Sequence, residues 1–412
     1  MIRRRRILFV AENVTLAQVV RLVALAKSLD PSQHEVHFAC SDFDPLIFRG
    51  SSFHRWPIHT ISRWFVDRAI ERGRRIYDQR TLRRYVKDEL ELFSQVQPDL
   101  VVGDFRQSLA VSAPVAGIPY ANLINAYWSP YAERDAFPLP DHPMVRLLGE
   151  ELAGRHFPRA MPWVFDHFAR PVNDVRKEHG LPSLGSLPEV LTAGDAVLFP
   201  DISSLVPTRE LPSHQHYLGP VLWSPDVPLP EWWSSLDRFK PTIYVTLGSS
   251  GRIDLLPTVI DGLQHLPVNV MLATAGRARA DVVGSNILSV DYLPGDLAAR
   301  RADVVICNGG STTGYQALGE GTPVIGIPYN LDQYLSMQAI ERYGAGVTLR
   351  SGTFTAARLR AAVALVLADS AYARRARSLA RELSLHDARS RFAGIVQQMT
   401  SGSSATARLV AP

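Results

Sequence analysis

The first part of the chain alternates short apolar runs with longer segments whose apolar residues recur at helical spacing. The run Ile7–Ala11 predicts a buried strand, and Ala17–Leu29 predicts the helix that follows it. Such alternation is typical of a parallel sheet with helices on both faces, which binds its ligands at the carboxyl ends of the strands. The other predicted elements of this part are strands at Glu35–Ala39 and Asp99–Gly103 and helices at Tyr85–Val96 and Ser108–Ala116.

A second α/β series follows a proline-rich stretch without clear periodicity at 200–240, which we interpret as the crossover between domains. Strands are predicted at Ile243–Leu247, Val268–Ala273 and Ile287–Val290, with a helix at Leu255–Leu266. The pattern therefore predicts an α/β fold with two halves that are unrelated in sequence. The predicted boundaries are 1–218 with the linker from about 200, 219–384, and a C-terminal helix and polar tail at 385–412.

Composition narrows the class of protein. The chain has 412 residues, 46% of them hydrophobic, so it can bury more than one ordinary core. Its net charge of +4 comes from scattered arginines, notably Arg3–Arg6 and those within 63–75. This excess favours weak attraction to anionic ligands or membrane surfaces, but it is too small and dispersed to indicate nucleic-acid binding.

The two cysteines and the apolar runs bear on location. Cys40 and Cys307 both lie in strand-like apolar runs, which is typical of reduced core thiols in a cytosolic protein. The run Ile7–Val10 is too short for a signal peptide, and no apolar run is long enough to span a membrane. We expect a cytoplasmic protein without a metal cluster.

The stretch from Ile306 to Gly346 carries the clearest chemistry. An apolar run ends at Asn308, Gly309 and Gly310, and Ser311 begins a probable helix. Glycines let a backbone approach a ligand closely, and helix N-termini attract phosphate. A second strand pattern then leads to the pair Asp332–Gln333, whose groups suit sugar hydroxyls. Taken singly, these residues also fit a tight turn and helix caps.

Candidate acceptor-binding segments lie in the first part of the chain. Residues 126–143 crowd aromatic, proline and charged residues without a clean period, which predicts an irregular loop. Residues 63–77 form a basic helical candidate that contains aromatic residues. A solvated helix and a surface loop are the alternative interpretation.

The order of several motifs gives a resemblance. Gly248–Ser249 follows a strand, 291–294 reads Asp-Tyr-Leu-Pro, Asn308–Ser311 forms the glycine turn, and Asp332–Gln333 closes the series. This resembles the donor half of the family 1 nucleotide-sugar glycosyltransferases, and specifically their bacterial natural-product branch. The similarity covers most of the chain. It implies the GT-B fold with an active site in the interdomain cleft, a UDP- or dTDP-sugar donor, no cofactor or metal, and inversion at the anomeric carbon.

The resemblance also implies roles for individual residues. Tyr292 and Leu293 would lie against the base, Gln316 would lie near the ribose, and Asp332 and Gln333 would bind the sugar. Gln316 stands where UDP users often have glutamate, which leaves UDP and dTDP both open. The residues implied to hold the diphosphate are Ser249, Asn308, Gly310, Ser311 and Thr312.

Two positions depart from the family pattern. Asn308 replaces a usual histidine, so the phosphate turn lacks that positive charge. The catalytic histidine position falls at Gln18, which cannot act as a base at neutral pH, while its partner aspartate matches Asp104. Positioned bases contribute typically 10²–10⁴-fold in rate.

Three explanations of the Gln18 position remain open. Asp104 or Glu12 takes the proton directly, or an acidic acceptor such as a phenol needs only positioning by Gln18, or the chain is a non-catalytic binding protein. We expect an inverting glycosyltransferase acting on a lipophilic or aromatic small molecule. A non-catalytic nucleotide-sugar-binding or partner protein and a nucleotide-sugar epimerase are the alternatives. Peripheral membrane contact is left open, as is the choice between monomer and homodimer.

Overall fold

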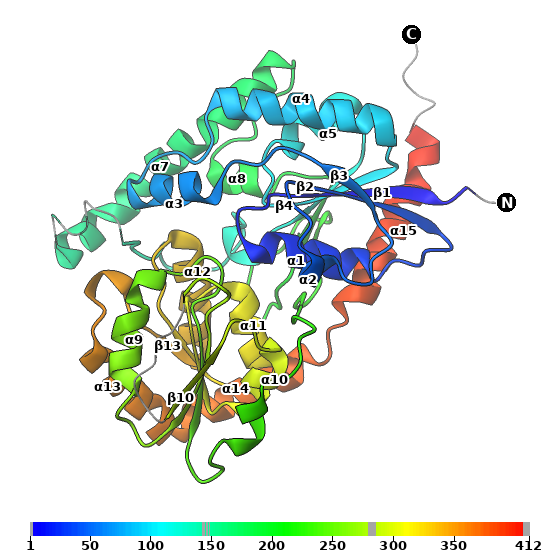
Figure 1. The fold of residues 1–412 in the computed structure, drawn as a ribbon. Helices are drawn as coiled ribbons and strands as arrows, with labels where there is room; N and C mark the ends of the chain where they lie inside the picture. Colours follow the sequence, from blue (N-terminus) through cyan, green and yellow to red (C-terminus); the bar gives the residue numbers. More distant parts are fainter. Residues whose placement is uncertain (1–2, 142–144, 146, 148, 279–285, 407–412) are drawn as a thin grey trace. The chain divides into compact units, whose positions relative to one another are not determined.

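The computed structural model describes residues 3–141, 145, 147, 149–278 and 286–406. The described residues group into two compact units, each with one parallel sheet (Figure 1). The first unit draws on residues 1–135, 156–221 and 387–412, and the second on residues 136–155 and 222–386. The predicted fold class, two α/β domains with parallel sheets, is confirmed.

The first sheet has seven strands in the order β3-β2-β1-β4-β5-β6-β7. The strand order reverses between β1 and β4, where ligands of open α/β sheets usually bind. The strands are β1 (Arg5–Ala11), β2 (His34–Cys40), β3 (His54–Pro57), β4 (Leu100–Asp104), β5 (Tyr120–Leu123), β6 (Ala196–Phe199) and β7 (Gln215–Tyr217).

The helices of the first unit start and stop where local capping allows. For example, the helix predicted from Tyr85 begins earlier, because the Asp78 side chain accepts from the Thr81 N–H at 2.7 Å and caps the first turn. The helices are α1 (Leu16–Ala26), α2 (Pro45–Phe48), α3 (Arg63–Glu71), α4 (Gln79–Val96), α5 (Leu109–Ala116), η1 (Ala126–Trp128) and α8 (Leu187–Leu191). Helix α7 (Glu150–Glu178) begins among residues of the second unit and ends in the first.

The C-terminal helix α15 (Ala388–Thr406) packs on the first sheet. Its Phe392 is fully buried, and the ring lies 6.0 Å from that of Phe9 on β1. Residues 401–406, predicted as the start of a polar tail, continue the helix. The apolar face that ends in Val396 therefore ties the chain's last helix to its first strand.

The second sheet has six strands in the order β10-β9-β8-β11-β12-β13, which reverses between β8 and β11. The strands are β8 (Thr242–Thr246), β9 (Asn269–Ala273), β10 (Ile287–Val290), β11 (Val304–Cys307), β12 (Val324–Gly326) and β13 (Gly346–Thr348). The helices are η2 (Glu231–Ser235), η3 (Ile253–Leu255), α9 (Leu256–Leu263), α10 (Gly295–Arg301), α11 (Ser311–Gly319), α12 (Leu331–Tyr343), η4 (Ser351–Thr353), α13 (Ala356–Ala368) and α14 (Ser370–Leu383).

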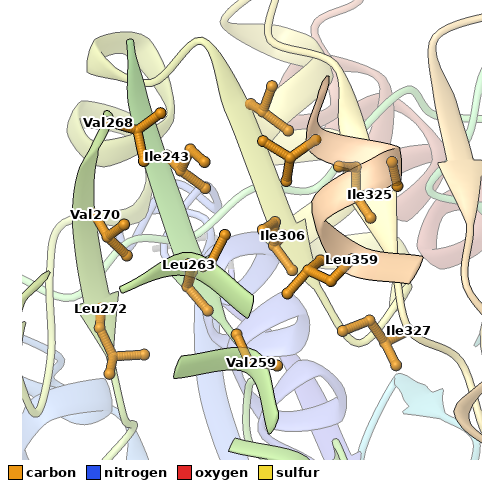
Figure 2. Packing of buried hydrophobic residues seen from close by; sticks show 14 of the residues in the cluster. Ile243, Val259, Leu263, Val268, Val270, Leu272, Ile306, Ile325, Ile327 and Leu359 are labelled. Carbon is orange, nitrogen blue, oxygen red and sulfur yellow. The ribbon is translucent and has the colours of Figure 1, made fainter. Parts of the chain in front are cut away.

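Figure 2 shows the core on one face of this sheet. Ile243 of β8 and Ile306 of β11 point toward Leu263 of α9 and Leu359 of α13, and all four are buried. Each such side chain contributes about 1.5–3 kcal/mol through burial of apolar surface. This packing fixes the sheet, and so the positions at which its strands end.

Part of the segment predicted as an irregular, acceptor-binding loop makes contacts within the protein. Tyr127 and Trp128 of η1 are buried. Further along, the Asp141 carboxylate accepts hydrogen bonds from the hydroxyls of Tyr334 (2.9 Å) and Ser351 (2.7 Å). It also pairs with Arg350 at 2.9 Å. These contacts explain why residues 136–141 group with the second unit although they precede it in the chain.

Candidate functional site

The loops that follow β8 and β11 lie at the switch point of the second sheet. Neighbouring strands are parallel, with Thr246 of β8 in register with Cys307 of β11. Their carboxyl ends therefore meet at one edge, which brings the Gly248–Gly251 loop beside the Asn308–Gly310 turn. The predicted motif order thus becomes a spatial cluster.

The glycine turn after β11 is shaped by a left-handed glycine and a buried asparagine. Gly309 has a φ of 78°, and an added Cβ would lie 2.7 Å from Cγ of Met337, so only glycine fits there. Asn308 is buried and organises the turn: its Oδ1 accepts from the Gly310 N–H at 3.1 Å, and its Nδ2 donates to Oγ of Ser250 at 3.0 Å. Asn308 therefore links the two loops.

Helix α11 begins directly after this turn. Gly310 is its N-cap and brings no side chain to the first N–H groups. Ser311 and Thr312 of the first turn are partly exposed. Oγ1 of Thr312 is buried and has no hydrogen-bond partner within the described part of the chain. A hydroxyl and a helix N-terminus at this place suit a phosphate oxygen.

The predicted sugar-binding pair divides into two roles. Gln333 is 2% exposed; its Oε1 accepts from the Tyr329 N–H at 3.1 Å and its Nε2 donates to the Ser250 carbonyl at 3.4 Å. Its amide thus joins two loops of the protein. Asp332, in the first turn of α12, is partly exposed and remains the predicted contact to a sugar.

The residues predicted to face the base also differ from one another. Tyr292 is 39% exposed, and its hydroxyl donates to the Ala275 carbonyl at 3.3 Å, whereas Leu293 is buried. Gln316 donates to the Trp223 carbonyl and to Oγ of Ser224, so its amide holds residues 223–224 against α11. The Tyr292 ring is therefore the accessible surface among them.

In the first unit, the residues predicted at the proton-transfer step, Asp104, Gln18 and Glu12, are all engaged in internal bonds. Asp104, at the end of β4, is fully buried and accepts from Nε and Nη2 of Arg21 at 2.8 and 2.7 Å. Arg21 also donates to Asn125 at 2.8 Å. Asp104, one of the two residues expected to take the proton directly, is thus paired with Arg21 through both of its oxygens.

The Gln18 side chain caps the N-terminus of helix α1. Its Oε1 accepts from the backbone N–H of Thr15 at 3.0 Å and of Val14 at 3.3 Å. The residue is 8% exposed. This is the reciprocal half of a capping arrangement, so the glutamine has a structural reason to occupy the position.

Glu12 lies in a buried cluster directly after β1. Its carboxylate accepts from the Tyr85 hydroxyl at 2.9 Å and faces Nη1 of Arg106 at 3.4 Å. Arg106, fully buried, also pairs with Glu89 at 2.7 Å. Desolvation outweighs the attraction of Arg106 and raises the pKa of Glu12 from 4.5 to about 7. Burial thus brings the pKa of Glu12 close to neutrality, where a carboxylate can exchange a proton.

Within the described part of the chain, one group of metal-ligand side chains lies on the edge strand β3 and its neighbour β2. The Glu35 carboxylate lies 3.1 Å from Nε2 of His37 and 3.6 Å from Nε2 of His54. The indole N–H of Trp56 donates to Nδ1 of His37 at 3.0 Å. With Nδ1 accepting, the neutral ring carries its proton on Nε2, which then donates to Glu35 instead of binding a metal. The group is best explained as a hydrogen-bonded sheet edge.

Two Rossmann-like units, one of them with phosphate-type turns at its switch point, are the architecture of the GT-B fold. Comparison with known proteins shows the family. Residues 257–399 match the family model for the C-terminal domain of erythromycin biosynthesis protein CIII-like proteins. The chain is 49% identical to the PGL/p-HBAD biosynthesis glycosyltransferase of Mycobacterium tuberculosis, over 92% of this chain and 88% of that protein. It belongs to the family 1 glycosyltransferases, in their natural-product branch.

Further relatives and solved structures extend the comparison. The chain is 50% identical to a PGL/p-HBAD biosynthesis rhamnosyltransferase of Mycobacterium bovis, over 92% of this chain and 84% of that protein. An inactive PGL/p-HBAD biosynthesis glycosyltransferase of the same species is 48% identical over 63% of this chain and 71% of its own length. The spinosyn forosaminyltransferase SpnP shares the fold, with a TM-score of 0.70 at 20% identity over 97% of this chain and 100% of its own.

A Streptomyces glycosyltransferase, SsfS6, solved with thymidine diphosphate, has a TM-score of 0.68 at 21% identity, over 96% of this chain and 100% of its own.

No helix among the described residues is both long and apolar enough to cross a membrane.

Several residues that shape these sites escaped the sequence analysis. Arg21, Arg106 and Arg277 each make two or more of the bonds that fix a strand-end loop or cluster. Arg106 and Arg277 closely follow strand ends, which was a usable signal. Arg21 lies inside a helix, and nothing local distinguishes it from a surface arginine.

Proposed function

We propose that this glycosyltransferase moves a sugar from a UDP- or dTDP-sugar to a hydroxyl of a lipophilic or aromatic small molecule, with inversion and without a metal ion. The observation that carries the donor half is the meeting of the Gly248–Gly251 loop with the Asn308–Gly310 turn at the start of α11. Backbone N–H groups in such turns suit a diphosphate. The names of the relatives support the reaction class and a PGL/p-HBAD type of acceptor.

Within this proposal, the diphosphate contacts fall to residues around the two turns, and Tyr292 stacks on the base. Asp332 accepts from sugar hydroxyls, since a carboxylate offers several acceptor positions. Gln333 and Gln316 act by holding loops, given the bonds that their amides make. The proposed diphosphate contacts are Ser249, Gly310, Ser311 and Thr312, with Asn308 shaping the turn.

Both nucleotides remain candidates for the donor. The bound thymidine diphosphate in SsfS6 supports dTDP, and the family resemblance supports UDP equally. Calorimetric titration with UDP and dTDP decides between them. Failure to bind either nucleotide would exclude the proposed donor class.

For the proton-transfer step, we propose Glu12 as the candidate base. Its pKa of about 7 is close to the value that serves a base at neutral pH, while Arg21 engages Asp104. If the acceptor is a phenol, the demand on the base is smaller. Glu12→Gln should therefore lower turnover more with an aliphatic alcohol as acceptor than with a phenol. Equal losses of turnover with the two acceptors would remove Glu12 from this role.

Exposed aromatic residues on α3 are our proposed contact for a lipophilic acceptor. Trp64 is 65% and Phe65 47% exposed, and the Arg68 guanidinium lies 4.7 Å from the centre of the Trp64 ring. Trp64→Ala should raise KM for a lipophilic acceptor and leave KM for the nucleotide sugar unchanged. Peripheral membrane contact by the same helix is tested by flotation with anionic vesicles. The wild type should float with the vesicles, and the Trp64→Ala variant should not.

A non-catalytic binding protein is the second candidate. It is favoured by the capping bonds of Gln18, which replace the expected base, and by the inactive relative. Turnover assays with a panel of nucleotide sugars and phenols separate the two functions. Nucleotide binding without transfer, not rescued by Gln18→His, would support the binding protein. An altered free sugar would instead indicate an epimerase.

A further inference from the structure

The loop after β8 is held by three side chains from the segments that follow β9, β11 and β12. Nη1 of Arg277, after β9, donates to the carbonyls of Gly248 (3.1 Å) and Gly251 (2.8 Å). Asn308, after β11, donates to Oγ of Ser250 at 3.0 Å, and Gln333, at the start of α12, donates to the Ser250 carbonyl at 3.4 Å. The strands concerned, β9, β8, β11 and β12, are consecutive in the sheet.

These bonds determine which way the loop presents its N–H groups. In a trans peptide the C=O and the following N–H point in opposite directions. Because the carbonyls of Gly248 and Gly251 point at Arg277, the N–H groups of Ser249 and Arg252 are turned away from it. N–H groups set by a turn in this way form the concave sites that bind anions.

Close packing leaves the loop little freedom. A Cβ on Gly251 would lie 2.1 Å from the Leu247 carbonyl oxygen and 2.9 Å from Cβ of Asn308. Both neighbours are at or near the backbone, so they cannot move aside cheaply. The loop is thus fixed from within by Gly251 and from outside by Arg277.

The backbone that carries Arg277 is itself unusual. Ala275 has a φ of 55° and Gly276 a φ of 68°, and the Arg277 N–H donates to the Thr274 carbonyl at 3.2 Å. A non-glycine residue in this conformation is uncommon and tends to occur at functional sites. The Tyr292 hydroxyl holds the Ala275 carbonyl at 3.3 Å. The turn directs Arg277 from β9 toward the loop after β8.

We infer that Arg277 is a positioning residue for the diphosphate of the nucleotide sugar, and that it brings the positive charge which the neutral Asn308 does not. This rests on the proposed donor class. Guanidinium remains charged at all physiological pH values, and its fixed donors can hold two carbonyls at once. Preorganised dipoles and charge aimed at a diphosphate strengthen its binding without acting on the nucleoside.

The test compares Arg277→Gln, Arg277→Lys and a control, Arg300→Gln, in the full-length protein. Arg300 pairs with Glu320 on the surface of the same unit, so its loss removes an arginine without touching the loop. Thermal unfolding checks that each variant is folded. Calorimetry then measures the affinity for UDP and dTDP at low and high ionic strength. Ligand-observed NMR measures the binding of uridine and thymidine.

We expect Arg277→Gln to weaken the binding of the nucleotide that the wild type prefers by about tenfold or more and to reduce the salt dependence of that binding. Binding of the matching nucleoside should not change. Arg277→Lys should recover part of the loss, because it restores the charge but not the fixed pair of donors. KM for the nucleotide sugar should rise while KM for the acceptor stays constant.

Two results would overturn the inference alone. One is nucleotide affinity in Arg277→Gln equal to that in Arg300→Gln, and the other is a parallel loss of nucleoside binding, which would indicate general damage to the unit. A wild-type protein that binds neither UDP nor dTDP would overturn the proposed donor class, and the inference with it.

Discussion

The strand ends of the two sheets carry similar residue types but use them differently. In the first unit, Asp104 and Glu12 are buried and bonded to Arg21 and Arg106. In the second, Arg277 and Gln333 donate to carbonyls of the loop after β8 and direct its backbone. Polar groups that satisfy one another stabilise a fold, whereas groups that satisfy a loop's carbonyls leave its N–H side to serve a ligand. The following predictions test this difference, from the largest expected effect to the smallest.

Removing Arg106 should be the most damaging change in the first unit. Arg106→Leu leaves Glu12 and Glu89 as buried carboxylates without their cation, and loss of one partner of a buried pair costs about 3–5 kcal/mol. Urea unfolding measures the difference. The control is Arg83→Ala, which breaks an exposed pair with Glu178 and should cost less than about 1 kcal/mol. Equal effects would show that the buried cluster contributes no special stability.

The pH dependence of stability should reveal Glu12. Its pKa is raised to about 7 in the folded protein, so the folded state holds this proton more tightly than the unfolded state. The contribution to stability is complete below pH 4.5 and is lost as the pH rises through about 7.

The full change is about 3 kcal/mol, since each pH unit between the two pKa values is worth about 1.4 kcal/mol. Urea unfolding at a series of pH values should show this decline in the wild type and a flatter profile in Glu12→Gln. Identical profiles would mean that Glu12 titrates normally.

A smaller effect on stability, but a specific one on binding, is expected in the glycine turn. Gly309→Ala forces a left-handed backbone on alanine, at about 1–2 kcal/mol, and brings its Cβ against Met337. Displacement of the turn should weaken UDP or dTDP binding severalfold. Gly394→Ala on α15, where an added Cβ meets nothing within 4 Å, is the matched control and should be neutral or slightly stabilising. Unchanged nucleotide affinity in Gly309→Ala would separate the turn from the donor site.

Asp141 should affect stability alone and not nucleotide binding, so its overall effect is the smallest. Asp141→Asn keeps the shape of the side chain but loses the charge that faces Arg350, so we expect about 1–2 kcal/mol of destabilisation without a change in nucleotide affinity. Differential scanning calorimetry and titration with UDP and dTDP measure the two quantities. A large loss of affinity would give residues 136–141 a part in donor binding.

Most elements were predictable because their signals are local. Ile7–Ala11 is an uninterrupted apolar run and Ile243–Leu247 is broken only by Thr246, and both proved to be central strands. Cys40 and Cys307 are free and buried, as predicted, and burial raises the pKa of Cys307 to about 11. Boundaries were less certain: the Asp78 cap lengthened α4, and α15 continued into the expected tail.

The candidate site likewise contains a part that could be predicted from local signals and a part that could not. The glycine turn and its order relative to Gly248 and Asp332 could be predicted, because each motif is a few residues long. The pairing of Asp104 with Arg21 could not, because the two residues are 83 positions apart and meet only when β4 lies beside α1. The same holds for Arg277, whose partners Gly248 and Gly251 precede it by 29 and 26 positions.

The sequence by itself determined the two α/β units, the glycine turn and the family, since periodicity and short motifs are properties of neighbouring residues. The tertiary structure decided which polar groups are consumed inside the protein and which direct a loop toward a ligand. Gln18 became a cap, Gln333 a tie between loops, and Arg277 the residue that orients the loop after β8. The physical reason is that a hydrogen-bond partner is chosen by proximity in space, which only the packed sheet establishes.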